Sequence, residues 1–262
     1  MITPKKQLGQ HWLNENTILL AIADAAEVRV GDFILEIGPG LGSLTRVLID
    51  KGAKILAVEL DESLAGGLKK QIGAGDNLTV ISQDILKFDF SQLPTDYKIV
   101  ANIPYYLSSH LLRLISETKN PPVQASLLLQ KEVTERVCAK PGQMSTLSVT
   151  TQMYFEATPG MVVRAGLFTP PPKVDSQLLI LNKREQPLFG NNDPKELFRL
   201  VKAGFGERRK KLRSSLSSGL YINKTQAEKL LNEARIDSNL RAQNLSLDDW
   251  LNLFKSWSAT KS

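Results

Sequence analysis

Short apolar runs alternate with stretches of helical periodicity along the first two thirds of the chain. The runs are bounded by glycine, proline or polar residues and are too short for buried helices, so they predict strands. The predicted strands are Phe33–Ile37, Ile55–Glu59, Leu78–Ile81, Ile99–Asn102, Ala125–Gln130 and Gln177–Leu181. The predicted helices are one capped by Asn14 or Asn16, then Thr45–Leu48, Leu107–Ser116, Glu132–Cys138 and Ser145–Phe155. This alternation indicates an α/β fold built on a doubly wound sheet.

Four consecutive predicted strands each carry a polar residue at or near the carboxyl end. Glu36 lies near the end of the first strand and Glu59 ends the second; Asp84 follows the third and Asn102 ends the fourth. In an open parallel sheet, the carboxyl ends of the strands form the edge where ligands bind. The sequence therefore predicts one binding site at these four strand ends.

A glycine-rich turn, Gly38-Pro39-Gly40-Leu41-Gly42, joins the first strand to a helix. Strand, glycine turn and helix form a nucleotide-binding unit, because glycines let the backbone approach a ligand closely. The dinucleotide fingerprint G-x-G-x-x-G has a different spacing. Glycines at every second residue, preceded by Glu36, resemble the pattern of S-adenosylmethionine-dependent methyltransferases.

Glu59 and Asp84 are candidates to hold an adenosine group. A carboxylate at Glu59 can accept hydrogen bonds from both ribose hydroxyls. Asp84 can accept one from the adenine amino group. The alternatives are a solvent-facing acid at Glu59 and, at Asp84, a cap for a helix over residues 85–88.

The stretch from Asn102 to Tyr105 suits an exocyclic amino group on a planar base. The Asn102 side-chain oxygen can accept a hydrogen bond, and Pro104, which has no N–H, leaves carbonyl oxygens free. The Tyr105 ring offers a flat surface for the base. When both hydrogens of the amino group are held by hydrogen-bond acceptors, the lone pair of the amino nitrogen moves out of the ring, and the nitrogen becomes a nucleophile. The alternative is a strand and turn in which Asn102 bonds its own backbone.

Phe168 begins a stiff loop, residues 168–176, that contains three consecutive prolines. We expect an exposed Phe168 ring, held over a bound base opposite Tyr105. The alternative is a rigid connection into the following strand, with Phe168 in the core.

The last third of the chain differs in pattern and charge. Polar residues 182–193 predict a linker, and the apolar positions beyond it recur at helical spacing. Residues 1–182 hold 17 basic and 18 acidic groups, whereas residues 183–262 hold 16 and 9. We therefore predict one domain at 1–185 and a basic helical domain at 186–262. A dense basic cluster in the second is predicted to contact RNA phosphates, the alternative being a solubilising run: Arg208, Arg209, Lys210, Lys211 and Arg213.

The composition is that of an ordinary globular protein, with 42% hydrophobic residues, 23% charged residues and a net charge of +6. The single cysteine, Cys138, excludes an internal disulfide, and with only two histidines no metal site is expected. The sequence has no long apolar run and no signal-peptide pattern. We therefore expect a cytoplasmic protein without membrane contact, whose basic last third binds a polyanion.

Together these stretches resemble the bacterial-type small-subunit rRNA adenine N6,N6-dimethyltransferase family, which methylates two adjacent adenines. The resemblance spans nearly the whole chain and rests on residues 9–13, 36–42, 102–105, 168–176, 206–213 and 241–246. It implies a Rossmann-like methyltransferase domain and a small all-helical RNA-binding domain. The partner it implies is small-subunit rRNA within a pre-ribosomal particle, and we expect a monomer.

The resemblance also implies residue roles. Its methyl donor is S-adenosylmethionine, with no metal, and the donor would be held by His11, Leu13, Gly38, Glu59, Asp84 and Asn102. By composition alone, the segment that contains the first two would be a frayed tail. Asn102 and the Pro104 carbonyl would hold the target amino group, with Tyr105 and Phe168 stacking on the adenine.

Two other functions are compatible with these motifs. Large-subunit rRNA adenine methyltransferases of the antibiotic-resistance type share the catalytic stretch, although the Arg208 cluster and Gly9-Gln10 favour the small-subunit type. A non-catalytic rRNA-binding assembly factor on the same fold is the other. Intact Glu59, Asn102 and Tyr105 argue against it.

Overall fold

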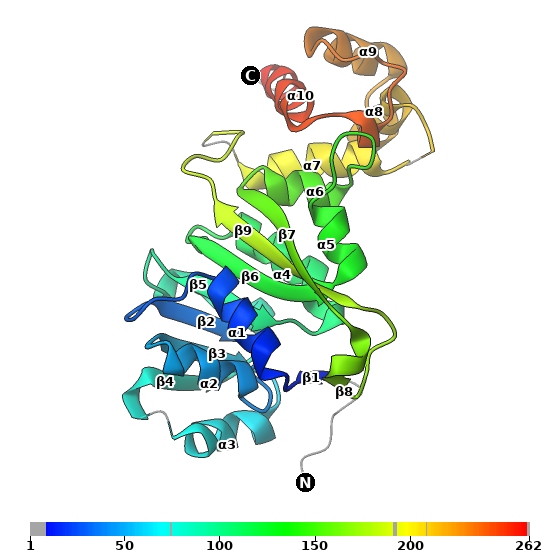
Figure 1. Ribbon diagram of the computed structural model, residues 1–262. Coiled ribbons are helices and arrows are strands. Elements are labelled where there is room, and N and C mark those ends of the chain that lie inside the picture. The colour runs from blue at the N-terminus through cyan, green and yellow to red at the C-terminus, as the bar shows by residue number, and fades with distance from the viewer. Residues whose placement is uncertain (1–8, 74, 191–192, 208, 261–262) are drawn as a thin grey trace. The chain divides into compact units, whose positions relative to one another are not determined.

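The computed structural model describes residues 9–73, 75–190, 193–207 and 209–260, which divide into two compact units (Figure 1). The first unit contains the residues up to Thr134 together with Glu156–Lys183, and the second contains Glu135–Phe155 and the residues from Arg184 onward. The later junction lies close to the predicted boundary at 185. The structure differs from the prediction for Glu135–Phe155, because buried side chains of this segment belong to the helical core of the second unit.

A seven-stranded sheet with the order β4-β3-β2-β5-β6-β9-β7 forms the centre of the first unit. Neighbouring strands from β4 to β6 are parallel, and β9 is antiparallel to β6. The strands are β2 Phe33–Ile37, β3 Lys54–Glu59, β4 Leu78–Ser82, β5 Lys98–Asn102, β6 Gln124–Gln130, β7 Phe155–Val163 and β9 Ser176–Lys183. The strand order reverses between β2 and β5, which is the switch point where such sheets bind ligands.

The six predicted strands are confirmed with small shifts at their ends, but β7 was not predicted. Its sequence contains Pro159 and Gly160, which weaken the signal for a strand. A proline is tolerated because β7 lies at the edge of the sheet, where an N–H is not needed for a second neighbour. The helix predicted to reach Phe155 is correspondingly shorter, and Phe155 begins β7.

Helices cover both faces of the sheet, and Figure 1 shows α1 and α2 in front of it and α4 behind it. They are α1 Asn16–Ala25, α2 Ser43–Asp50, α3 Glu62–Ile72 and α4 Ser108–Glu117. Buried Ile22 of α1 and Leu48 of α2 pack with Ile34 of β2 in one core cluster. The N-cap of α1 is Glu15, so neither of the two predicted asparagines caps this helix.

The remaining short elements lie in the connections. A two-stranded sheet is formed by β1 Trp12–Leu13 and β8 Phe168–Thr169. The 3-10 helices are η2 Gly75–Asn77, η3 Ile85–Lys87, η4 Phe90–Gln92, η5 Tyr105–Leu107, η6 Ala165–Leu167 and η7 Ala242–Asn244. Two of them, η3 and η5, directly follow strand ends that the sequence marked as functional.

The second unit is helical, as predicted. Its helices are the end of α5 Lys131–Val137, then α6 Thr146–Gln152, α7 Pro194–Phe205, α8 Leu212–Leu220, α9 Lys224–Glu233 and α10 Leu247–Ala259. Fully buried Trp250 stacks on Phe205 with 5.4 Å between ring centroids. Within the described ranges, no helix is long and apolar enough to cross a membrane.

Candidate active site

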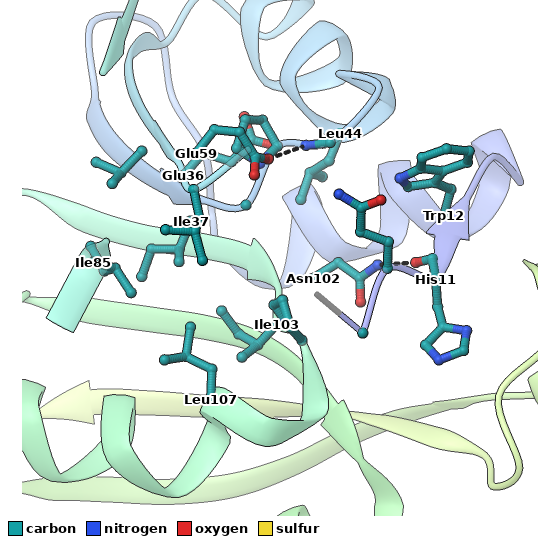
Figure 2. A pocket seen from close by; sticks show the side chains of 18 of the residues that line it. His11, Trp12, Glu36, Ile37, Leu44, Glu59, Ile85, Asn102, Ile103 and Leu107 are labelled. Atoms are coloured by element: carbon teal, nitrogen blue, oxygen red, sulfur yellow. Dashed lines mark hydrogen bonds between the residues drawn. The ribbon is translucent and has the colours of Figure 1, made fainter. Parts of the chain in front are cut away.

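A pocket lies in the first unit, at the carboxyl ends of β2 to β5 (Figure 2). All six residues predicted to hold the methyl donor line it: His11, Leu13, Gly38, Glu59, Asp84 and Asn102. The residues predicted to hold the target base line it as well: Pro104, Tyr105 and Phe168. The structure thus brings both groups together, and the role of each residue stays a prediction.

The glycine turn after β2 forms one wall of the pocket. The Gly38 N–H donates to the Val58 carbonyl oxygen at 2.9 Å, which ties the turn to β3. Gly42 caps α2 with a left-handed φ of 77°, and a Cβ at this position would lie 2.6 Å from the Ile72 Cδ1 of α3. The left-handed φ would strain any other residue here, and its side chain would have to displace the end of Ile72, so the tight passage from strand to helix favours glycine.

Glu59, at the end of β3, is buried and faces the pocket. Its Oε2 accepts a hydrogen bond from the Gly40 N–H at 3.1 Å, and its Oε1 accepts one from the Asp61 N–H at 2.9 Å. Desolvation raises the pKa of this carboxyl above its usual range, although the two backbone bonds oppose the shift. The carboxylate keeps further lone pairs, so it can still accept two ligand hydroxyls. The solvent-facing alternative for Glu59 is therefore wrong.

Glu36 also lines the pocket, and Figure 2 shows it on the same side as Glu59. It is 1% exposed, and its Oε2 is buried without a hydrogen-bond partner. Burial raises the pKa of this carboxyl to about 8; the neighbouring Thr45 hydroxyl lowers it and the Glu59 charge raises it further. A buried carboxyl oxygen without a partner in the lining of a pocket marks a place that suits a hydrogen-bonding ligand.

Asp84 follows β4 and begins η3. Its Oδ1 accepts a hydrogen bond from the Leu86 N–H at 3.0 Å, so the capping alternative is confirmed. Because Asp84 also lines the pocket, capping fixes the side chain there without excluding a ligand contact through its remaining acceptor sites.

The segment from Gly9 to Leu13 is docked against the pocket, so the frayed-tail interpretation is wrong for these residues; residues 1–8 lie outside the described part of the chain. Trp12 pairs with Thr169 and Leu13 with Phe168 in the β1–β8 sheet. A Cβ on Gly40 would lie 3.2 Å from the Trp12 indole, so this ring packs directly on the glycine turn.

Asn102, at the end of β5, is oriented by this segment. Its Nδ2 donates to the His11 carbonyl oxygen at 3.1 Å, a bond drawn in Figure 2. The self-bonding turn proposed as an alternative for Asn102 is not the observed arrangement. With the amide nitrogen engaged, Oδ1 is left as an acceptor at the pocket.

The rings of His11 and Tyr105 are stacked, with 5.6 Å between centroids and 29° between planes. The His11 Nδ1 donates to the Pro170 carbonyl oxygen at 2.7 Å, and the Tyr105 hydroxyl bonds the Ser176 Oγ at 3.0 Å. Burial raises the pKa of Tyr105 above its usual range, which keeps the phenol neutral. These contacts fix Tyr105 through one face of its ring and through its hydroxyl.

Two expectations about the target side need correction. The Pro104 carbonyl oxygen is not entirely free, because it accepts the Leu107 N–H at 2.9 Å in the turn of η5 and so has one remaining lone pair. Phe168 is only 3% exposed and belongs to the core cluster, as its alternative proposed, because β8 pairs it with Leu13. It nevertheless forms part of the pocket wall.

Some side chains of the basic cluster in the second unit already have partners within the protein, and others are exposed and so available for contact with RNA. Arg208 lies outside the described residues. Lys211 donates from Nζ to the Asn239 Oδ1 at 2.7 Å, and Arg213 pairs with Glu228 at 3.2 Å. Arg209 and Lys210 are exposed and remain the better candidates for contact with RNA.

Sequence reasoning gave no role to Trp12, and it placed Glu36 at a strand end of the predicted binding site and before the glycine turn without giving it a ligand to hold. Their pocket positions depend on packing between distant segments, although the strand-end position of Glu36 was a usable signal. Among the residues that the structure describes, no group of three or more His, Cys, Asp or Glu side chains could hold a metal ion.

Comparisons with known proteins show the family of this chain. A family model described as "Ribosomal RNA adenine dimethylase" matches residues 1–259. "Ribosomal RNA small subunit methyltransferase A" of Thermosynechococcus vestitus is 41% identical over 97% of this chain and 96% of its own length. The protein of the same name from Dehalococcoides mccartyi strain CBDB1 is 37% identical over 95% of this chain and 87% of its own length.

Two solved structures share the fold over nearly the whole chain. A dimethyladenosine transferase from Plasmodium falciparum superposes with a TM-score of 0.82 at 26% identity, covering 96% of this chain and 98% of that one. The 23S rRNA methyltransferase ErmE gives 0.74 at 27% identity, covering 94% and 99%. Fold, family model and curated relatives agree, and the chain belongs to the ribosomal RNA adenine dimethylase family of S-adenosylmethionine-dependent methyltransferases.

Proposed function

We propose that this protein transfers methyl groups from S-adenosylmethionine to the N6 amino groups of two adjacent adenines in small-subunit rRNA. The observation that carries the proposal is the geometry of Asn102. Its amide is fixed by the His11 carbonyl at the end of β5, with Oδ1 left as an acceptor at the pocket that Tyr105 also lines. Curated relatives of high similarity are named for the small subunit, which favours that substrate over the large subunit.

The pocket fits S-adenosylmethionine by its hydrogen-bonding groups. The ligand carries ribose hydroxyls and an amino group as donors, and the pocket presents the buried carboxyl groups of Glu36 and Glu59, with Oε2 of Glu36 lacking a hydrogen-bond partner. Glu59 would accept the ribose hydroxyls and Asp84 the adenine amino group. The backbone at Gly38, Leu13 and the His11 carbonyl would meet the amino-acid end. When bound, the sulfonium supplies an activated methyl group.

The target side would act by hydrogen bonding and stacking. Asn102 Oδ1 and the free lone pair of the Pro104 carbonyl would accept the two amino hydrogens of adenine, which moves the nitrogen lone pair out of the ring. An adenine that leaves its stack in the RNA loses its stacking contacts, and a flat surface of the protein must replace them. The Tyr105 ring would provide that surface, and Phe168 would contribute to the same pocket wall.

RNA binding would use the second unit. Exposed Arg209 and Lys210 sit between α7 and α8 in a region of excess positive charge, which suits contacts with phosphates. We propose that the substrate is rRNA within a maturing small subunit, that the protein acts as a monomer, and that it works in the cytoplasm, where ribosomes mature.

The test is transfer of labelled methyl groups to small ribosomal subunits that lack the modification, followed by mapping of the modified adenines. Wild type should modify two adjacent adenines of small-subunit rRNA. Asn102→Ala should lose at least about 100-fold in rate if both amino hydrogens must be held. Exposed Asn77, which does not line the pocket, provides the matched control Asn77→Ala. Transfer only to large-subunit rRNA, or to no rRNA, would refute the proposal; in the second case the non-catalytic assembly factor would be favoured.

A further inference from the structure

Tyr106 is an aromatic residue of the pocket that the proposed reaction leaves without a role. It follows Tyr105 in η5 and lines the pocket, but it is 54% exposed. Tyr105 is held by His11 and Ser176, whereas the Tyr106 ring is left half in water. A large aromatic ring at the mouth of a ligand pocket gains stabilisation when a ligand covers it.

The surroundings of Tyr106 show which part of the pocket it reaches. A Cβ on Gly9 would lie 3.4 Å from Tyr106 Cδ1, so one edge of the ring packs on the backbone of the N-terminal segment. After burial, which acts most strongly, the charges of Asp84 and Glu59 raise the pKa of the Tyr106 phenol. Tyr106, Asp84 and Glu59 line the same pocket. The ring thus joins the N-terminal segment, at Gly9, to the pocket that also contains the ends of β3 and β4.

We propose that Tyr106 contacts the adenosine half of S-adenosylmethionine and helps to retain it in the pocket. The inference rests on the proposed function, since the ligand is the methyl donor of that reaction. The ring packs on Gly9 and lines the same pocket as the two acids assigned to ribose and adenine. The neutral phenol donates one hydrogen bond, either to a ribose oxygen or to one of these carboxylates.

An RNA contact is the competing explanation, because an exposed tyrosine can also stack on a nucleotide beside the target base. The two explanations differ in the ligand whose affinity depends on Tyr106. A cofactor contact changes binding of adenosine-containing ligands in the absence of RNA. A nucleotide contact leaves that binding unchanged.

Calorimetry with two ligands tests the inference. S-adenosylhomocysteine contains both halves of the methyl donor, and 5′-methylthioadenosine contains only the adenosine half. Tyr106→Ala should weaken both by the same factor, about tenfold, which corresponds to about 1.4 kcal/mol. Tyr106→Phe keeps the ring and should lose only about threefold to fivefold, the part due to the phenol hydrogen bond. Tyr221 is 92% exposed in the second unit, and Tyr221→Ala should change neither affinity.

Each other outcome has a definite meaning. Wild-type affinity for both ligands in Tyr106→Ala overturns the inference, and a raised KM for rRNA alone in that variant assigns the residue to RNA. Weaker binding of S-adenosylhomocysteine with unchanged binding of methylthioadenosine also overturns it, because the contact then lies at the amino-acid half. If wild type binds neither ligand, the proposed function itself fails. Tyr106→Phe guards against misfolding, since it retains the packing on Gly9.

Discussion

Glu36 provides the most direct physical test of the pocket, because its carboxyl is almost fully buried in the pocket lining. Burial raises its pKa from 4.5 in the unfolded chain to about 8 in the folded protein. Between these values the folded state keeps a proton that the unfolded state has lost. The unfolding free energy therefore falls as pH rises, by about 1.4 kcal/mol per unit.

The expected effect is large compared with the stability of a domain. From near pH 5 to near pH 8, the Glu36 contribution should lower the unfolding free energy by about 4 kcal/mol, out of the 5–15 kcal/mol typical of a folded domain. Glu36→Gln replaces the carboxyl by a neutral group of the same shape. The difference between variant and wild type should therefore move in favour of the variant by about 4 kcal/mol over this range.

Urea unfolding followed by circular dichroism measures this difference. The transition of the first unit is the one that S-adenosylhomocysteine shifts, because a ligand stabilises only the unit that binds it. Exposed Glu132 supplies the control Glu132→Gln, which should change the unfolding free energy by no more than about 0.5 kcal/mol at each pH. A Glu36→Gln difference that does not vary with pH would refute the reasoning, because Glu36 would then be charged in the folded protein as well.

Four further predictions concern the pocket, the basic cluster and the helical core. Glu59→Ala should weaken S-adenosylhomocysteine binding by about 100-fold, because it removes the ribose acceptor and the acceptor of the Gly40 and Asp61 N–H groups. Unchanged affinity in calorimetry would contradict the assignment. Tyr105→Ala should slow single-turnover methyl transfer about tenfold to 100-fold from lost stacking, whereas Tyr105→Phe should retain most activity; equal rates for Tyr105→Ala and wild type would remove the stacking role. Replacing Arg209 and Lys210 together by Ala should reduce the slope of log binding constant against log salt concentration for RNA by about two, without changing cofactor affinity. An unaltered slope would show that these side chains do not contact phosphates. Gly219→Ala should destabilise the second unit by about 1–3 kcal/mol in thermal unfolding, because the new Cβ would lie 2.6 Å from the Ala203 Cα of α7. This loss should exceed the gain in helix propensity that alanine brings. A more stable variant would show that α7 and α8 can separate at low cost.

The sequence predicted those parts of the fold that local patterns determine. Each of the central parallel strands is a short apolar run, because strands covered by helices on both faces have no polar side to alternate with. β7 escaped prediction because its local sequence, with Pro159 and Gly160, resembles a turn and only its place at the sheet edge makes a strand possible. The helices at Glu135–Phe155 were predicted, but their membership in the second unit depends on core contacts that no local pattern encodes.

The candidate site was predictable where residues sit at strand ends and unpredictable where distant segments pair. Glu59, Asp84 and Asn102 follow from the geometry of a parallel sheet. Phe168 was misjudged because a proline-rich loop suggests exposure, whereas pairing with Leu13 buries the ring. The interaction lies between residues far apart in the sequence, so composition near either residue carries no trace of it.

The N-terminal segment has the largest effect on the site relative to its weak sequence signal. Through its carbonyl, His11 fixes the Asn102 amide; its ring stacks on Tyr105 and its Nδ1 bonds the Pro170 carbonyl beside β8. His11 therefore contacts the Asn102 amide, the Tyr105 ring and the loop that follows Phe168 in the chain. The first two are the groups expected to hold the amino group and the base. Without this docked segment, Asn102 could turn toward its own backbone, which is the local arrangement that an isolated strand and turn would favour. The orientation of the acceptor is thus set by a segment whose own composition predicts no structure.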